Sequence, residues 1–227
     1  MKIIIAKEVF EKFHPQFAIA FLQVNSFDPQ SKLEESCHLL QEQERLVQLL
    51  FHKNTKKYHE LISNWRVVVE GLKGKHYSTS LEKIMRTVLS KRTLATKNSL
   101  QNLVYYIALK YFVPVGIDDS KSIDHDLTFS IATGVEKGGS FRKLKKGELY
   151  YKDKKGIIAT RLDYWKSSRT KLRKNSTAAL IHIEAVPPIT LENLKKMAQE
   201  LSTLLKTFCY ARTKLVILVK EDNQRVF

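Results

Sequence analysis

Cysteine and long apolar runs are both scarce in this chain of 227 residues. Its two cysteines, Cys37 and Cys209, have neither a nearby partner nor metal-ligand spacing, which argues against a disulfide-stapled domain. We expect both to be small buried groups in a reducing compartment. No apolar run approaches the roughly 20 residues that cross a bilayer, and the run that starts at Met1 meets Lys7 too early for a signal peptide. The sequence therefore predicts a soluble, cytoplasmic protein without a membrane segment.

Motifs for nucleotides and metals are also missing. There is no G-x-x-x-x-G-K-[ST] phosphate loop and no G-x-G-x-x-G motif after a strand, so we expect no nucleotide cofactor of those kinds. His52 and His59 are seven residues apart and His125 stands alone, which is not metal-ligand spacing. The sequence predicts neither a cofactor nor a metal site.

Acidic residues are outnumbered, with 23 Asp and Glu against 39 Lys and Arg, and the formal net charge is +16. The excess is concentrated in a basic segment, residues 141–175, where 13 cations face only Glu148, Asp153 and Asp163. This concentration favours a polyanion partner over the alternative, a solvated face that promotes solubility. The segment also holds aromatic residues that can stack on unpaired bases, namely Phe141, Tyr150, Tyr151, Tyr164 and Trp165.

The spacing of hydrophobic residues along the chain predicts one α+β unit over residues 1–227. In this unit, helices pack on an antiparallel or mixed β layer. Residues 1–112 are mostly helical after two strands, at 3–5 and 17–24. The expected helices cover residues 7–13, 31–53, 55–72, 80–89 and 99–111. Residues 113–227 are β-rich, with expected strands at 127–132, 148–152, 157–162, 178–183 and 214–219. One late helix, capped by Thr190, is expected to end near Cys209.

The stretch from Arg161 to Lys171 is the richest in chemical groups. It holds cations and hydroxyls suited to phosphate contacts, which are Arg161, Lys166, Ser167, Ser168, Arg169, Thr170 and Lys171. The alternative is a twisted edge strand protected by charges. No Ser–His–Asp or Cys–His arrangement is visible, so hydrolysis here would use a positioned water. Further on, alternation places His182 on one strand face with Leu180 and Glu184, which favours a hydrogen-bonded sheet histidine over a catalytic one.

An ordered series of tracts resembles a known domain. The tracts cover residues 102–119, with the sequence Pro114-Val-Gly-Ile-Asp-Asp119, then 138–144, 147–156, 161–171 and 181–188. Together they resemble the B-three/B-four domain of the β subunit of phenylalanyl-tRNA synthetase. They look still more like the free-standing proteins that consist of this domain alone. The likeness is good from about Leu81 to Thr207.

The resemblance implies a fold and an activity. The fold would be a three-layer unit with helices packed on a β-sandwich of unusual topology. In the synthetase this module hydrolyses tyrosine wrongly attached to the tRNA for phenylalanine. The chain is thus expected to bind tRNA and to act as a trans-acting hydrolase that deacylates misacylated aminoacyl-tRNA, and 227 residues leave no room for a complete synthetase. The alternatives are a non-catalytic tRNA- or RNA-binding module and a protein-interaction remnant.

Candidate site residues follow from the matched tracts. Asp118, Asp119 and Glu184 are candidates to orient water, and Lys166 to polarise the ester carbonyl. The residues expected to line the substrate pocket are Asn102, Gly116, Trp165, Ser168 and Thr170. The residues expected to bind RNA are Arg142, Lys143, Lys145, Lys146, Arg161, Arg169, Lys171, Arg173 and Lys174.

Gly116 stands where the synthetase tract Pro-Leu-His-Ala-Phe-Asp carries its histidine, and the synthetase's Gly-Gly-Glu segment falls near residues 164–166, where no glutamate stands. Two explanations of Gly116 compete. Either the backbone needs a conformation or a close approach that a side chain would block, or the pocket is enlarged for a different amino acid. We expect the second, because the related module accommodates a histidine in this tract.

Overall fold

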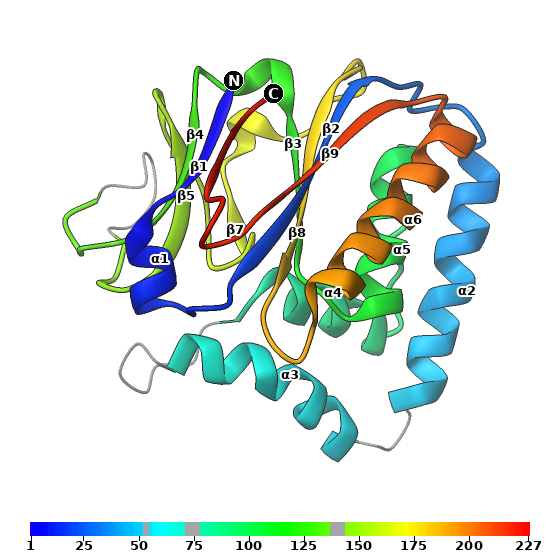
Figure 1. Ribbon diagram of the computed structural model, residues 1–227. Helices are drawn as coiled ribbons and strands as arrows, with labels where there is room; N and C mark the ends of the chain where they lie inside the picture. The colour runs from blue at the N-terminus through cyan, green and yellow to red at the C-terminus, as the bar shows by residue number, and fades with distance from the viewer. Residues whose placement is uncertain (52–54, 71–77, 137–143) are drawn as a thin grey trace.

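The computed structural model describes residues 1–51, 55–70, 78–136 and 144–227, and it folds them into two sheets and a layer of helices (Figure 1). The helices are α1 (Lys7–Lys12), α2 (Leu33–Phe51), α3 (Thr55–Glu70), α4 (Ser80–Leu89), α5 (Ser99–Tyr111) and α6 (Leu191–Cys209), with short 3-10 helices η1 (Ser120–Ser122) and η2 (Ser168–Thr170). The strands are β1 (Lys2–Ile5), β2 (Ala18–Ser26), β3 (Val115–Asp119), β4 (Leu127–Ile131), β5 (Leu149–Asp153), β6 (Gly156–Thr160), β7 (Trp165–Lys166), β8 (Ala179–Ala185), β9 (Arg212–Leu218) and β10 (Gln224–Val226).

An antiparallel sheet in the order β3-β8-β2-β9 forms the middle layer. Strand β8 is buried at every position and β2 at most of its positions, as expected for strands that are covered on both faces. The second sheet has the order β10-β1-β4-β5-β6-β7 and is mixed, because β1 runs parallel to β4. The rings of Phe21, Phe129, Tyr151 and His182 pack between the sheets, with centroids 4.7 to 5.9 Å apart.

Helices α2, α4, α5 and α6 lie on the other side of the middle sheet (Figure 1). Thr79, Asn98 and Thr190 cap α4, α5 and α6, since each side chain accepts a hydrogen bond from the backbone N–H three residues later. The cap predicted at Thr190 is therefore confirmed. So are the α+β class and the packing of helices on a β-sandwich. None of the helices in the described residues is both long and apolar enough to cross a membrane.

Two sheet edges meet at one end of the sandwich. Strand β3 is an edge of the middle sheet, and β7 is an edge of the second sheet. Val115, Ile117 and Asp119 alternate along β3 with Gly116 and Asp118, so the two groups point to opposite faces. Gly116 pairs with His182 of β8, which brings that side of β3 into the space between the sheets.

Candidate functional site

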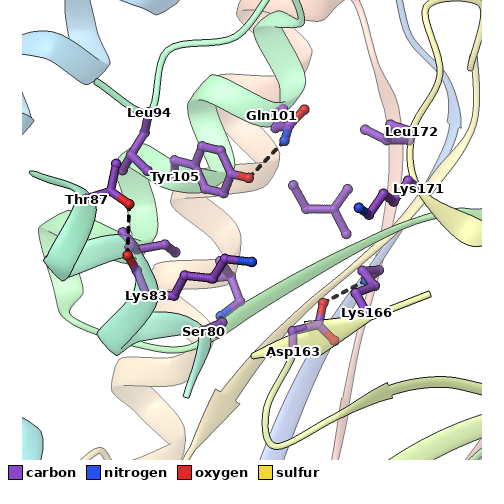
Figure 2. Close-up of a pocket in the computed structure, with 13 residues that line it drawn as sticks. Ser80, Lys83, Thr87, Leu94, Gln101, Tyr105, Asp163, Lys166, Lys171 and Leu172 are labelled. Carbon is purple, nitrogen blue, oxygen red and sulfur yellow. Dashed lines mark hydrogen bonds and ion pairs between the residues drawn. The ribbon is translucent and has the colours of Figure 1, made fainter. Parts of the chain in front are cut away.

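An open cleft of about 340 Å³ lies along β3, between helices α4 and α5 on one side and the segment around β7 on the other (Figure 2). Asp163 and Lys166 form part of its wall and are joined by a hydrogen bond. The remaining lining residues are Ser80, Lys83, Ile84, Thr87, Leu94, Gln101, Tyr105, Val115, Ile117, Lys171 and Leu172. The cleft thus combines an apolar wall with several cations and the carboxylate of Asp163.

Behind this wall, four side chains form a buried polar network. Lys166 Nζ donates to Asp163 Oδ2 at 2.7 Å and to Tyr151 OH at 2.9 Å, and it lies 3.0 Å from Asp118 Oδ1. The Tyr151 hydroxyl lies 2.8 Å from Asp118 Oδ2 and 2.7 Å from Asp163 Oδ1. Burial disfavours the charged ammonium, but Asp118 and Asp163 outweigh it and raise the pKa of Lys166. Lys166 is therefore a fixed cation at neutral pH.

His182 and Glu184 extend the network between the sheets. His182 Nε2 lies 3.3 Å from Tyr151 OH, and Nδ1 lies 2.7 Å from Glu184 Oε1. Both side chains are essentially inaccessible to solvent. Burial lowers the pKa of His182, but Glu184 and then Asp163 outweigh that effect and raise it. Burial together with Asp118 and Asp163 raises the pKa of Tyr151 well above its ordinary value, so its hydroxyl stays protonated.

A strained turn positions Asp163 at the cleft. Arg161, Leu162 and Asp163 have φ angles of 57°, 52° and 61°, so three consecutive residues that are not glycine lie in the left-handed region. Each such residue costs about 1–3 kcal/mol, and strain of this kind gathers at functional sites. Arg161 anchors the turn by two hydrogen bonds to Glu148 Oε1, at 3.0 and 2.7 Å. The left-handed backbone that places Asp163 at the cleft therefore lowers the free energy of unfolding.

Gly116 is explained by a close approach. An ideal Cβ built at this position would lie 2.0 Å from His182 Nε2 and 2.6 Å from Asp163 Oδ2. No real Cβ makes such contacts, so a side chain here would displace the network. The expectation of a pocket enlarged at Gly116 is wrong, because the imidazole of His182 fills that space.

The candidate catalytic residues are only partly brought together. Asp118, Lys166 and Glu184 belong to one network, as described above. Asp119 lies outside it, because Ser176 Oγ donates to its Oδ2 at 2.6 Å and its Oδ1 caps η1 by accepting from Lys121 N at 3.0 Å. Asp118, Asp119 and Glu184 are all buried and none of them lines the cleft, so the expectation that they orient water there is wrong.

The residues expected to line the substrate pocket lie mostly elsewhere. Asn102 is fully buried and joins α5 to α2 and to the loop before α5, through Ser36, Cys37 and Thr96. Trp165 leaves β7 on the opposite face from Lys166 by strand alternation. Ser168 is exposed, and Thr170 is fully buried. None of these four side chains lines the cleft, so their expected role in it is wrong.

Two of the expected RNA-binding residues pair with carboxylates of the protein itself. Arg161 is paired with the buried Glu148. Arg169 binds both carboxylate oxygens of Asp153, at 2.8 and 2.7 Å, and also the Ser122 carbonyl, so three of its hydrogen bonds are made within the protein. Lys145, Lys146, Lys171, Arg173 and Lys174 are exposed. Arg142 and Lys143 lie outside the described residues.

Arg169 also brings exposed cations together. Asp153 begins the turn between β5 and β6, so its two bonds to Arg169 hold η2 against that turn. Lys154 and Lys155 of the turn are exposed, as are the cations that follow η2. We call Lys154, Lys155, Lys171, Arg173 and Lys174 the basic rim, and Lys171 connects it to the cleft.

Sequence reasoning missed three members of the network and one cation of the cleft. In the sequence, Asp163 is only a charge that opposes the basic segment, and Tyr151 is only a residue that can stack on bases. His182 is a sheet histidine by the same reasoning, although alternation does place it with Glu184. Lys83 lies on α4, far from the basic segment in sequence, and no local signal marks it. Their common feature is long-range proximity, which a single sequence does not display.

Comparisons with known proteins identify a domain family. Residues 65–209 match the family model of the B3/4 domain, which is more than half of the chain. This match confirms the resemblance to the B-three/B-four domain. A comparison with curated proteins gives no match. Among solved structures, an N-terminal fragment of the phenylalanyl-tRNA synthetase β subunit from Pyrococcus horikoshii is similar over 53% of this chain and 42% of that chain, with 13% identity and a TM-score of 0.40.

Proposed function

The chain belongs to the B3/4 domain family, and from this premise we propose that it binds tRNA and hydrolyses the ester of a wrongly attached amino acid. The observation that carries the proposal is the Asp163–Lys166 pair, which is buried in a polar network on one side and lines an open cleft on the other. The basic rim beside this cleft has the charge that a phosphate backbone requires.

The reaction needs a positioned water rather than a protein nucleophile. In this proposal Asp163 accepts a hydrogen bond from the attacking water, and Lys166 donates to the carbonyl oxygen as negative charge develops on it. The bond between the carbonyl carbon and the ribose oxygen then breaks, and the ribose oxygen takes up the proton that the attacking water gives up. The products are the free amino acid and a tRNA with its terminal hydroxyl restored. Asp118 and Tyr151 keep Lys166 in place.

A second candidate is a tRNA- or RNA-binding module that does not hydrolyse. It is favoured by one specific observation, since the three N–H groups of Lys166 have three oxygen atoms within 3.0 Å. A substrate carbonyl would have to compete with Asp118, Asp163 or Tyr151 for a donor. In this second case the network only stabilises the fold and the basic rim holds the RNA.

Ester loss from mischarged tRNA distinguishes the two candidates. The purified chain is incubated with tRNAs that carry wrong amino acids, and the remaining aminoacyl-tRNA is followed with time. We expect hydrolysis by the wild type and at least a hundredfold slower hydrolysis by Asp163→Asn, with tRNA affinity nearly unchanged. The matched control is Asp222→Asn, which changes an exposed carboxylate paired with Arg225. Binding of tRNA without ester loss from any member of the panel would support the second candidate.

A further inference from the structure

Branched aliphatic side chains form a large part of the cleft lining. Its apolar members come from separate elements and are Ile84, Leu94, Val115, Ile117 and Leu172. Ile84 and Val115 are nearly fully buried, whereas the other three are partly accessible. Because Val115 and Ile117 alternate along β3 with Gly116 and Asp118, one face of the strand is apolar and the other joins the polar network. A ligand in this cleft thus meets branched aliphatic groups on its helix side.

Two hydrogen bonds hold polar side chains in place on the helix side of the cleft. Gln101 Nε2 donates to Tyr105 OH at 2.8 Å, and Thr87 Oγ1 donates to the Lys83 carbonyl at 3.0 Å (Figure 2). A phenol hydroxyl that packed against the aliphatic side chains would lose its hydrogen bonds to water, which is costly for a polar group. The wall therefore suits a side chain that carries no polar atom.

The floor of the cleft suits a cation. Asp163 is the carboxylate among the described lining residues, and it accepts from Tyr151 at Oδ1 and from Lys166 at Oδ2. A carboxylate offers about four acceptor positions, so these two bonds do not exhaust it, and the side chain, which is 5% exposed, lines the cleft. The ammonium group of an amino acid is a ligand of the right charge. Lys83 and Lys171 also line the cleft and are exposed residues, so their ammonium groups can contact a phosphodiester.

We propose that the cleft selects an aminoacyl group with a short branched aliphatic side chain, an inference that rests on the function proposed above. Asp163 binds its ammonium, and the side chain packs on Ile84, Val115 and Ile117. At about 340 Å³ the cleft lies near the lower end of the range for small-molecule sites, which favours a compact group. Tyrosine is disfavoured, because its hydroxyl would lose hydrogen bonds to water where the ring packs on these aliphatic side chains.

Binding of stable analogues tests this selection separately from hydrolysis. The probes are 3′-amino-3′-deoxyadenosines acylated through an amide with valine, leucine, tyrosine or 3-methylbutanoic acid, the last of which is valine without its ammonium. Isothermal titration with the full chain should show valine and leucine analogues binding at least tenfold more tightly than the tyrosine analogue. Loss of the ammonium should weaken binding by tenfold or more. Ile117→Asn should remove the aliphatic preference, whereas the control Ile157→Asn, on β6 outside the cleft, should retain it.

The outcomes separate this inference from the proposed function. Equal or tighter binding of the tyrosine analogue overturns the aliphatic selection even if mischarged tRNA is hydrolysed. So does the absence of binding by every analogue while whole aminoacyl-tRNA loses its ester. An aliphatic preference without any ester loss supports the inference about the cleft and overturns the hydrolase. Unchanged binding of the analogue without an ammonium overturns the role given to Asp163.

Discussion

Gly116 and His182 occupy one space at the level of single residues. They pair across β3 and β8, and the imidazole lies where a Cβ at position 116 would be. We expect Gly116→Ala to lower the free energy of unfolding by about 1–3 kcal/mol or more, because overpacking displaces His182 and Asp163. Chemical denaturation of the two proteins measures this loss.

A double-mutant cycle identifies the cause of that loss. In a His182→Ala background the closest clash is gone, so Gly116→Ala should cost clearly less there than in the wild type. His182→Ala by itself removes a buried group and should also destabilise the protein. Equal costs of Gly116→Ala in both backgrounds would show that the clash with His182 is not the cause.

His182 should also make stability depend on pH. Its pKa is raised in the folded protein, so its contribution is fully present below the unfolded value near 6.5 and is lost as the pH rises through the folded value. The loss can reach at most about 1.4 kcal/mol per pH unit for one proton. Since Glu184 contributes most to raising this pKa, Glu184→Gln should move the loss to lower pH. Thermal denaturation at several pH values measures it.

An exposed histidine provides the control for this pH profile. His38→Gln changes a solvent-exposed side chain on α2, so the profile should keep its shape. A wild-type profile that stays flat above pH 6.5 would contradict a protonated His182. A Glu184→Gln profile that matches the wild type would contradict the part given to Glu184 in raising the pKa of His182.

Single residues of the site could be predicted only where neighbours along one strand share a face. Alternation places Glu184 and His182 together, and the structure places both in one network. Asp163 could not be found this way, because Arg161 and Leu162 are residue types that rarely adopt the left-handed region, so the sequence does not indicate this turn. The expected place of Asn102 is wrong because a matched tract says nothing of which helix face a residue occupies.

At the level of elements, the turn between β6 and β7 is the most demanding part of the site. Arg161 holds it through Glu148, whose side chain is fully buried while that of Arg161 is 13% exposed. Arg161→Ala would leave a buried carboxylate without its arginine partner, which typically costs about 3–5 kcal/mol. We expect a lower melting temperature. Because the turn would no longer fix the position of the Asp163 side chain, we also expect slower ester hydrolysis by the protein that remains folded.

A surface ion pair is the matched control for Arg161. Arg225 pairs with Asp222, and both side chains are about half exposed. Arg225→Ala should therefore change stability by no more than about 1 kcal/mol. Similar losses for Arg161→Ala and Arg225→Ala would contradict the anchoring role of the buried pair.

Elements whose hydrophobic residues recur with a clear period could be predicted from the sequence, whereas the strands at the site could not. The helical period predicts α2, α4, α5 and α6 to within a few residues. Strand β3 escapes prediction because Gly116, Asp118 and Asp119 are poor strand residues, and its place is fixed by pairing with β8. Strand β7 has only two residues, which is too short for any period. Both site-forming edges thus depend on tertiary pairing.

At the level of the whole molecule, the layers separate two sets of exposed cations. The helix layer carries Lys195 and Lys206 on α6, whereas the basic rim belongs to the turn between β5 and β6 and to the segment after η2. Three cations of the basic segment, Arg161, Lys166 and Arg169, neutralise its own carboxylates. The charge that a polyanion meets is therefore carried by other cations, among them those of the basic rim.

The salt dependence of tRNA binding tests this division. Each phosphate neutralised contributes roughly 0.7–0.9 to the slope of log affinity against log salt, so Lys154→Ala with Lys155→Ala should flatten the slope by roughly 1.4–1.8. Lys195→Ala with Lys206→Ala removes the same charge from α6 and should leave the slope nearly unchanged. Fluorescence anisotropy with labelled tRNA between low and physiological salt measures both slopes. Equal flattening by the two double variants would mean that tRNA responds to net charge alone, and the basic rim would then have no special part in binding.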